Sequence, residues 1–183
     1  MFTIEVEKDI ALALTVPYMA EEIFELAMKN KEYLLEWMGW IEDTNDVQDT
    51  KNFIDYALKG FANGELLVCS ILYKGKIVGA IDLHRMSQTN KKASIGYWLD
   101  YEHYGKGIVN KTLLALCKYA FENLQLNKLI ILCDKENIKS INVAKRAGFK
   151  EEALLRQEML VNGELRDFYR YALLKEDFKN NHA

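Results

Sequence analysis

Two glycines in the segment Tyr104-Gly105-Lys106-Gly107 lie where a strand-like stretch gives way to a helix-like one. Glycine has no side chain, so the backbone N–H groups of residues 105–108 can point together at one anion. The positive end of the following helix dipole would add to the attraction. The segment therefore predicts a cradle for a diphosphate, although a short glycine motif on its own more often marks an ordinary turn.

Other blocks supply the context that this turn lacks. They are Ile95-Gly96-Tyr97-Trp98-Leu99 leading into His103-Tyr104-Gly105-Lys106-Gly107-Ile108, Asn137-x-x-Ser140 running to Gly148-Phe149, Asn162-Gly163-Glu164-Leu165-Arg166-Asp167, and Leu34-x-x-Trp37-x-x-Trp40. Together they make the chain resemble the GNAT N-acetyltransferases, and within them the RimJ/RimL-like branch that acetylates the N-termini of ribosomal proteins. The blocks are jointly far more specific than any one motif, and they span nearly the whole chain.

The resemblance implies an α/β fold of the GNAT type, as a single domain over residues 1–183. Its central sheet would be mixed, mostly antiparallel and twisted, with about seven strands, flanked by helices and splayed between strands 4 and 5. In the family the strand before the glycine turn carries a bulge, and the pantetheine arm of acetyl-CoA pairs with backbone in the opened slot. Here those two strands would be residues 93–99 and 128–133, with Gly96 aiding the distortion.

The resemblance also implies which residues hold acetyl-CoA. They are Trp98, Leu99, His103, Tyr104, Gly105, Lys106, Gly107, Ile108, Asn137, Ser140 and Lys145. Asn137 would hold the pantetheine arm, although it is equally suited to cap a helix. The family favours Gln or Arg where this chain has Glu102, and a carboxylate cannot neutralise a diphosphate. Lys106, or Lys145 and Arg146, would then supply the positive charge.

The implied reaction is the attack of an amine on a thioester carbonyl. By analogy with the family, a backbone N–H near Leu99 would serve the oxyanion. Ser140 would donate a hydrogen bond to the leaving sulfur, because a hydroxyl can donate without carrying charge; a plain serine near a helix start is the alternative. Glu158 aligns with a carboxylate that acts as base in the ribosomal-protein branch, or else it is a solvent-facing strand residue.

The acceptor is predicted to be a protein N-terminus, with a small amine such as a polyamine, amino acid or drug as the alternative. An α-amino group has a pKa of about 7.7 to 8, so roughly a tenth of it is neutral at pH 7 and a weak base suffices. Tyr33, Trp37 and Trp40 would line the acceptor pocket, or belong to the core. A non-catalytic acyl-CoA-binding module is a third reading.

The elements that must position these residues follow from hydrophobic periodicity. An extended segment at residues 10–16 precedes three helical pieces, the first starting near Pro17. Alternation then predicts strands at 66–73, 76–83 and 93–99, and a helix carries apolar residues between 113 and 124. A buried strand at 128–133, a helix at 137–147 and a final hairpin at 158–161 and 167–174 complete the order.

Composition excludes several other classes of protein. The chain has 24 basic and 27 acidic residues, so it lacks the electrostatic footprint of direct nucleic-acid binding. No apolar run approaches a membrane span and no signal core is present, so a soluble, cytoplasmic protein is expected. The three cysteines have neither disulfide nor metal-ligand spacing, so no metal is predicted. A homo-oligomer is possible, but the sequence does not specify the number of copies.

Overall fold

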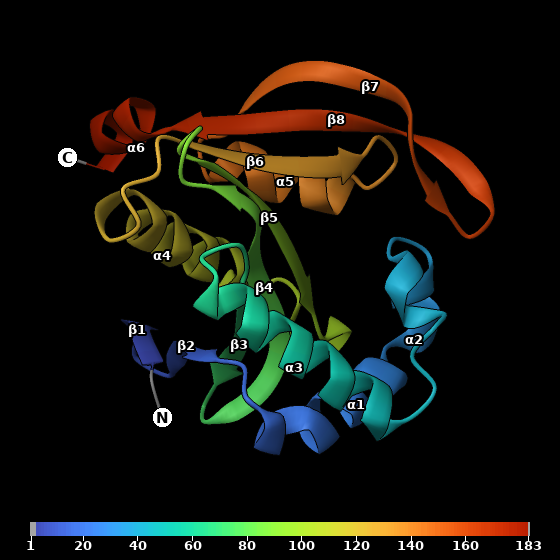
Figure 1. Cartoon of the computed structure of the whole chain (residues 1–183). Coiled ribbons are helices and arrows are strands. Elements are labelled where there is room, and N and C mark those ends of the chain that lie inside the picture. Colours follow the sequence, from blue (N-terminus) through green and yellow to red (C-terminus); the bar gives the residue numbers. More distant parts are fainter. Residues whose placement is uncertain (1–2, 183) are drawn as a thin grey trace.

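The computed structural model describes residues 3–182, and its centre is one twisted sheet of eight strands (Figure 1). The strand order is β1-β2-β3-β4-β5-β6-β8-β7. The strands are β1 (Thr3–Glu7), β2 (Ile10–Leu14), β3 (Leu67–Tyr73), β4 (Lys76–Ser87), β5 (Lys92–Leu99), β6 (Lys128–Asp134), β7 (Lys150–Val161) and β8 (Glu164–Leu174). Every neighbouring pair is antiparallel except β5 and β6, which are parallel.

Helices cover both faces of the sheet. They are α1 (Ala20–Lys29), α2 (Lys31–Leu35), α3 (Val47–Ala62), α4 (Ile108–Glu122), α5 (Ile138–Arg146) and α6 (Lys175–His182), with 3₁₀ turns η1 (Pro17–Met19), η2 (Gly39–Ile41) and η3 (Tyr101–His103). Leu67 and Cys69 of β3 belong to the same core as α4 and α5, whereas Val68 between them packs with Ala57 of α3. Alternate strand residues point to opposite faces, so α3 lies across the sheet from α4 and α5.

The predicted fold class is confirmed, with two corrections to the sheet. It has eight strands rather than about seven, because residues 3–7 pair with β2, with Thr3 opposite Ala13. The bulge expected within residues 93–99 is absent, since β5 pairs with β4 without a register shift from Ser94 to Leu99. The irregularity lies on β4 instead, between His84 and Ser87.

Gly96 has a different use from the one expected. A Cβ on this residue would lie 2.8 Å from Oδ2 of Asp82 on the neighbouring strand, so its missing side chain makes room for that carboxylate. The final hairpin is also longer than predicted, since β7 begins at Lys150, and α6 was not foreseen.

The β5–β6 pairing ends early. Only Lys92, Ala93 and Ser94 have partners, which are Lys128, Leu129 and Ile130. Beyond them β5 stays paired with β4 up to Leu99, and β6 stays paired with β8 up to Asp134. The two strands therefore diverge at their C-terminal halves while each remains anchored on its far side, as the expected splay requires.

The backbones of β4 and β5 lie very close together at the end of β5, and this close approach depends on Gly79 of β4. A Cβ there would overlap the carbonyl oxygen of Trp98 and lie 2.9 Å from the Leu99 Cα. Because both obstacles are backbone atoms, neither can move aside without displacing the end of β5.

We therefore predict that Gly79→Ala lowers the free energy of unfolding by about 1–3 kcal/mol, the usual cost of overpacking. Gly39→Ala is the matched control, since no atom lies within 4 Å of a Cβ at that position. Urea denaturation of both variants and the parent measures the difference, and equal stability of the two variants would contradict the close approach.

Candidate active site

The split between β5 and β6 opens into a cavity of about 750 Å³. The two diverging strands form its walls, and α2, the turn before α4, and α5 surround it. It lies in the size range typical of small-molecule and cofactor sites. The fold therefore leaves a long slot that runs between strands and ends at two helix N-termini.

Unpaired backbone lines this slot. The N–H of Asp100 donates to the carbonyl of Val78 on β4, at 2.8 Å. Backbone groups alternate in direction along a strand, so the N–H of Leu99 faces the other way, toward the slot. Leu99 therefore offers a donor at the position that the sequence assigns to the oxyanion.

The start of α4 is built to hold an anion. Gly105 and Gly107 have φ angles of +75° and +72°, a left-handed conformation that glycine adopts without steric cost. No side chain caps α4, and its first intrahelical bond runs from the Lys111 N–H to the Gly107 carbonyl. The amides of residues 108–110 precede that bond, so the helix itself does not use them.

Helix α5 begins differently, because Asn137 caps it. The side-chain oxygen of Asn137 accepts from the Ser140 N–H at 3.0 Å. Asn137 also lines the cavity, and its side-chain NH₂ is a separate donor. Asn137 can therefore cap α5 with its oxygen and still offer its NH₂ group for the expected contact to the pantetheine arm.

Ser140 lies between two side chains of the diverging strands. Its Oγ is 3.0 Å from the hydroxyl of Tyr97 on β5 and 3.3 Å from Sγ of Cys133 on β6. Burial raises the pKa of Tyr97, and it raises the pKa of the Cys133 thiol to about 11. Both groups thus keep their protons at neutral pH, which excludes a resting Cys133 thiolate as a nucleophile.

Three cations line the cavity on its helical side, namely Lys111, Lys139 and Arg146. Lys139 Nζ lies over the rings of Tyr33 and Tyr104, at 5.5 and 5.1 Å from their centroids. Lys111 pairs with Glu7 at 2.5 Å. These cations line the same cavity as the uncapped end of α4, and together they favour a polyanionic ligand.

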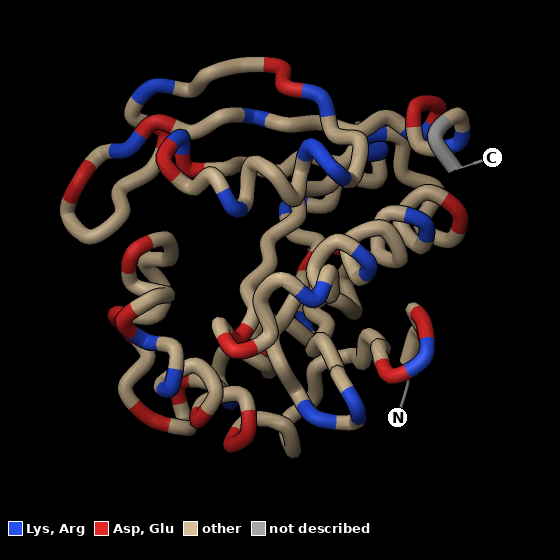
Figure 2. Tube along the Cα trace, turned by 180° about the vertical axis from the view of Figure 1, so that it is seen from behind, with Lys and Arg blue, Asp and Glu red and all other residues tan. Residues whose placement is uncertain are grey.

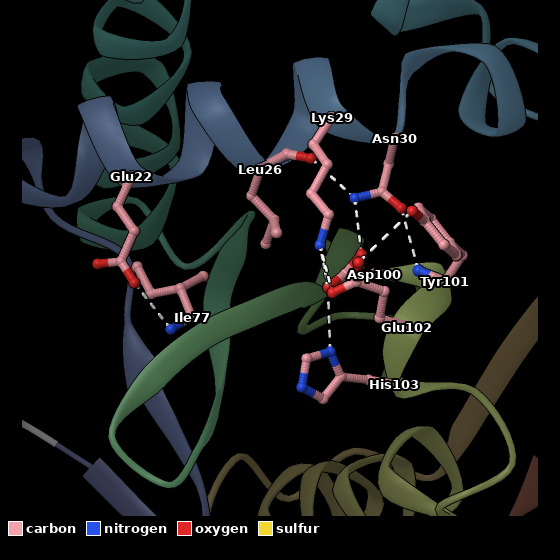
Figure 3. Close-up of polar contacts among 9 residues, drawn as sticks. All are labelled: Glu22, Leu26, Lys29, Asn30, Ile77, Asp100, Tyr101, Glu102 and His103. Carbon is pink, nitrogen blue, oxygen red and sulfur yellow. Dashed lines mark hydrogen bonds and ion pairs between the residues drawn. The ribbon is translucent and has the colours of Figure 1, made fainter.

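A buried carboxylate fixes the loop that leads into the glycine turn (Figure 3). Asp100 accepts from Asn30 Nδ2 at 3.0 Å, from Lys29 Nζ at 3.2 Å and from His103 Nδ1 at 3.0 Å. Burial alone would raise the pKa of Asp100, but these hydrogen bonds outweigh it and hold the pKa below its usual value. Hydrogen bonds to Asp100 thus hold the end of α1 against the loop that leads into the glycine turn.

The family model for the acetyltransferase (GNAT) domain matches residues 12–150. This chain belongs to that family. The GNAT chain is 36% identical over 181 residues to the putative ribosomal N-acetyltransferase YdaF of Bacillus subtilis (strain 168), which covers 98% of both chains. It is 29% identical over 170 residues to the ribosomal-protein-serine acetyltransferase of Escherichia coli (strain K12), covering 93% of this chain and 95% of that one.

A solved structure agrees with these relatives. RimL, described as a ribosomal L7/L12 alpha-N-protein acetyltransferase in complex with coenzyme A in a disulfide with a cysteine of that protein, superposes with a TM-score of 0.92. It is 25% identical and covers 94% of this chain and 98% of its own. The predicted family, the acyltransferase class and acetyl-CoA as the acetyl donor are therefore confirmed.

Most of the residues that the sequence singled out surround the GNAT cavity. Those that line it are Tyr33, Trp37, Trp98, Leu99, His103, Tyr104, Gly105, Gly107, Ile108, Asn137 and Ser140. Lys106, Lys145, Trp40 and Glu158 are outside this lining.

The four outlying residues have other surroundings. Lys106 Nζ lies over the ring of Tyr73, and Lys145 Nζ over that of Tyr171, 6.0 Å from its centroid. Trp40 is 44% exposed, with its ring 6.2 Å from that of Trp98, which does line the cavity. Glu158 is exposed on β7, beside an irregularity in the pairing with β8.

Sequence reasoning overlooked several residues of the site. Lys139, Asn142 and Val143 line the cavity together with Arg146, which the sequence had suggested as a source of positive charge. They lie seven, four and three positions before Arg146, so counting the helical period back from Arg146 would have found this face of α5, and Lys145 falls outside it. Glu102, expected to oppose a diphosphate, instead pairs with Lys29 at 2.7 Å.

We predict that Asp100→Asn lowers the free energy of unfolding at pH 7 by about 2 kcal/mol, since it weakens buried hydrogen bonds to a charge. The depressed pKa contributes stability that is present above the unfolded-state value near 3.9 and is lost as the pH falls through the folded value. The gap between the variant and the parent should therefore narrow below about pH 4.

Urea denaturation across a pH series measures this gap. Asp55→Asn, on the exposed surface of α3, is the control and should leave stability unchanged at every pH. If the difference in free energy of unfolding between Asp100→Asn and the parent stays constant down to acid pH, the charge of Asp100 does not contribute to stability.

Proposed function

We propose that this acetyltransferase modifies the N-terminal α-amino group of a protein, with a ribosomal protein as the first candidate. The observation that carries the proposal is the opened slot between β5 and β6, which joins the glycine turn before α4 to Tyr33 of α2 and to Trp37, just after α2, in one cavity. The full-length similarity to relatives named for ribosomal proteins supports the acceptor. A cytoplasmic location follows as an expectation, because ribosomal proteins are made there.

The cofactor would extend from the start of α4 into the slot. The amides of residues 105–110 suit the diphosphate, and Lys111, Lys139 and Arg146 suit its negative charge. The unpaired edges of β5 and β6 offer N–H and C=O groups to the amides of the pantetheine arm, as an added strand would use them. These roles replace those expected for Lys106 and Lys145.

The chemistry then falls to three groups of the chain. The Leu99 N–H faces the slot, where it can stabilise the developing oxyanion. The Ser140 hydroxyl can donate to the leaving thiolate, and Asn137 can hold the adjacent amide. Glu158 remains our proposed base, acting through water, because its exposed position and the low demand of an α-amino group both suit an indirect proton acceptor.

The acceptor side is bounded by α2 and by the hairpin between β7 and β8. Tyr33 and Trp37 line the cavity there. The Asn162 side chain donates to the carbonyl of Leu35, and Arg166 Nη1 donates to that of Glu36 at 3.0 Å. Arg166 also pairs with the buried Asp134 at 3.3 Å, which links this rim to the end of β6.

Nucleic acid is disfavoured as a direct partner. Figure 2 shows Lys and Arg positions interspersed with Asp and Glu positions along the trace, without an extended basic stripe over the described residues. Within residues 3–182, no helix combines the length and the apolar character needed to cross a membrane. Association into a homo-oligomer remains a prediction.

Gly107→Val should weaken coenzyme A binding by at least about tenfold, because a branched side chain would enter the anion cradle. The substitution also strains a residue at φ +72°. Gly64→Val is the matched control, since Gly64 has the same φ and open space around its Cβ position but lies at the end of α3. Calorimetry with coenzyme A should show loss of affinity for Gly107→Val alone; equal affinities would contradict the cradle.

The acceptor is tested with the purified enzyme and acetyl-CoA labelled in the acetyl group. We expect transfer to the α-amino group of ribosomal proteins and of peptides with their N-terminal sequences, with no transfer to the same peptides blocked at the N-terminus. Mass spectrometry of protein N-termini in cells with and without the enzyme gives the physiological acceptor. Transfer to polyamines or amino acids, and to no protein N-terminus, would contradict the proposal.

A further inference from the structure

Three side chains from separate elements meet inside the split. The last β5–β6 backbone pair is Ser94 with Ile130, and Tyr97 and Cys133 each stand three positions beyond it. In a continued parallel ladder these two residues would be opposite one another. Instead the Ser140 hydroxyl of α5 lies between them, 3.0 Å from the Tyr97 hydroxyl and 3.3 Å from the Cys133 sulfur. Hydrogen bonds among these three side chains thus take the place of the missing backbone hydrogen bonds between β5 and β6.

The direction of these hydrogen bonds decides where the Ser140 proton points. A serine hydroxyl has one proton to donate and two lone pairs that accept. The Tyr97 hydroxyl is also 3.3 Å from the Ser140 carbonyl oxygen, which can only accept. The single tyrosine proton is therefore placed between two acceptors of one residue, and Oγ is the nearer of the two. A proton shared between them makes Tyr97 a donor to the Ser140 hydroxyl as well as to the Ser140 carbonyl.

The environment keeps both neighbours protonated. Burial raises the pKa of the Tyr97 phenol, and burial raises the pKa of the Cys133 thiol to about 11. Neither group becomes an anion near neutral pH, so both can donate to the Ser140 oxygen. When both donate, the two lone pairs of that oxygen are occupied, and the serine proton is left for a partner within the cavity that Ser140 lines.

We propose that Tyr97 is a positioning residue for the transfer reaction, which orients the Ser140 hydroxyl so that its proton faces the sulfur of the leaving coenzyme A thiolate. The inference rests on the proposed function, which makes Ser140 the donor to that sulfur. No bond within Tyr97 or Ser140 breaks. The amine nitrogen forms the new bond to the acetyl carbon and gives its proton to the base, the C–S bond breaks, and the negative charge left on the sulfur is stabilised by an already oriented O–H donor.

Orienting the Ser140 hydroxyl before the reaction lowers the free energy needed to reach the transition state. A freely rotating hydroxyl would have to turn toward the sulfur during the reaction, whereas the hydrogen bonds from Tyr97 and Cys133 set its direction beforehand. Since the thiolate exists only late in the reaction, the contribution should appear in kcat and not in KM. Tyr97 should also matter only while the Ser140 hydroxyl is present.

The kinetic test compares Tyr97→Phe, Ser140→Ala and the double variant. We expect Ser140→Ala to lower kcat roughly a hundredfold and Tyr97→Phe about tenfold, with the KM for acetyl-CoA unchanged in both. The double variant should match Ser140→Ala within about twofold, because Tyr97 acts through that hydroxyl. Multiplicative losses in the double variant would overturn the proposal, since they would show that Tyr97 acts independently.

A second measurement needs no acceptor. Coenzyme A bound in its free-thiol form is titrated by the ultraviolet absorbance of its thiolate, with the complex of desulfo-coenzyme A as the blank. A directed Ser140 donor lowers the pKa of the bound thiol, so Tyr97→Phe should raise that pKa by about one unit relative to the parent. In the Ser140→Ala background, Tyr97→Phe should cause no further rise.

Tyr171→Phe is the matched control for loss of a buried phenol. Tyr171 is fully buried on β8 and its hydroxyl bonds to Glu151 at 3.1 Å, outside the cavity lining. This variant should keep the parental kcat and the parental pKa of the bound thiol. If it reproduces the Tyr97→Phe effects, those effects report general loosening and the proposal is wrong.

The proposed function and the role of Tyr97 can be tested separately. If the parent protein does not bind coenzyme A, the proposed function is wrong. If it binds coenzyme A and Tyr97→Phe leaves the pKa of the bound thiol unchanged, the function survives and the role of Tyr97 does not.

Discussion

Backbone pairing between β5 and β6 stops after Ser94 and Ile130, and the whole site depends on that early end. Unpaired N–H and C=O groups are costly when they are buried without partners. Here the cost is limited because they face a cavity, where water or a ligand amide can satisfy them. The split stays open because β4 holds β5 on one side and β8 holds β6 on the other, while Ser140 bridges the gap.

Helices α4 and α5 both begin at the cavity, and their N-termini differ in the chemical group that each suits. Helix α4 starts with a left-handed glycine and no side-chain cap, which leaves its amides for an anion. Helix α5 starts with Asn137, whose oxygen takes up one amide and keeps Ser140 in the first turn. A strongly charged group therefore suits α4, and a neutral, hydrogen-bonding group suits α5. The cofactor of this family has these two parts in that order.

Much of this arrangement could be predicted from the sequence. Periodicity gave the order of elements from residue 10 to residue 174, and the residues of the glycine turn and the Asn137–Ser140 pair line the cavity between β5 and β6. The first strand was missed because a short alternating segment is informative only when its partner is known, and that partner is β2. Tyr97 went unnoticed because it lies among apolar strand residues, and its polar partner comes 43 positions later.

The remaining differences arise from side-chain direction and long-range contact. Lys106 and Lys145 have the right charge and the right neighbourhood, but their side chains extend over Tyr73 and Tyr171 instead. Asp100 owes its environment to Asn30, 70 positions earlier. Local patterns specify elements and short motifs, whereas the direction of a long side chain is set by the tertiary environment.

The contacts between the β7–β8 hairpin and α2 have a consequence for how this enzyme can change over evolution. Asn162 and Arg166 reach main-chain carbonyls, which are present whatever side chains Leu35 and Glu36 carry. The contact between the hairpin and α2 therefore does not depend on which side chains α2 carries. These side chains can diversify while this edge of the cavity keeps its shape.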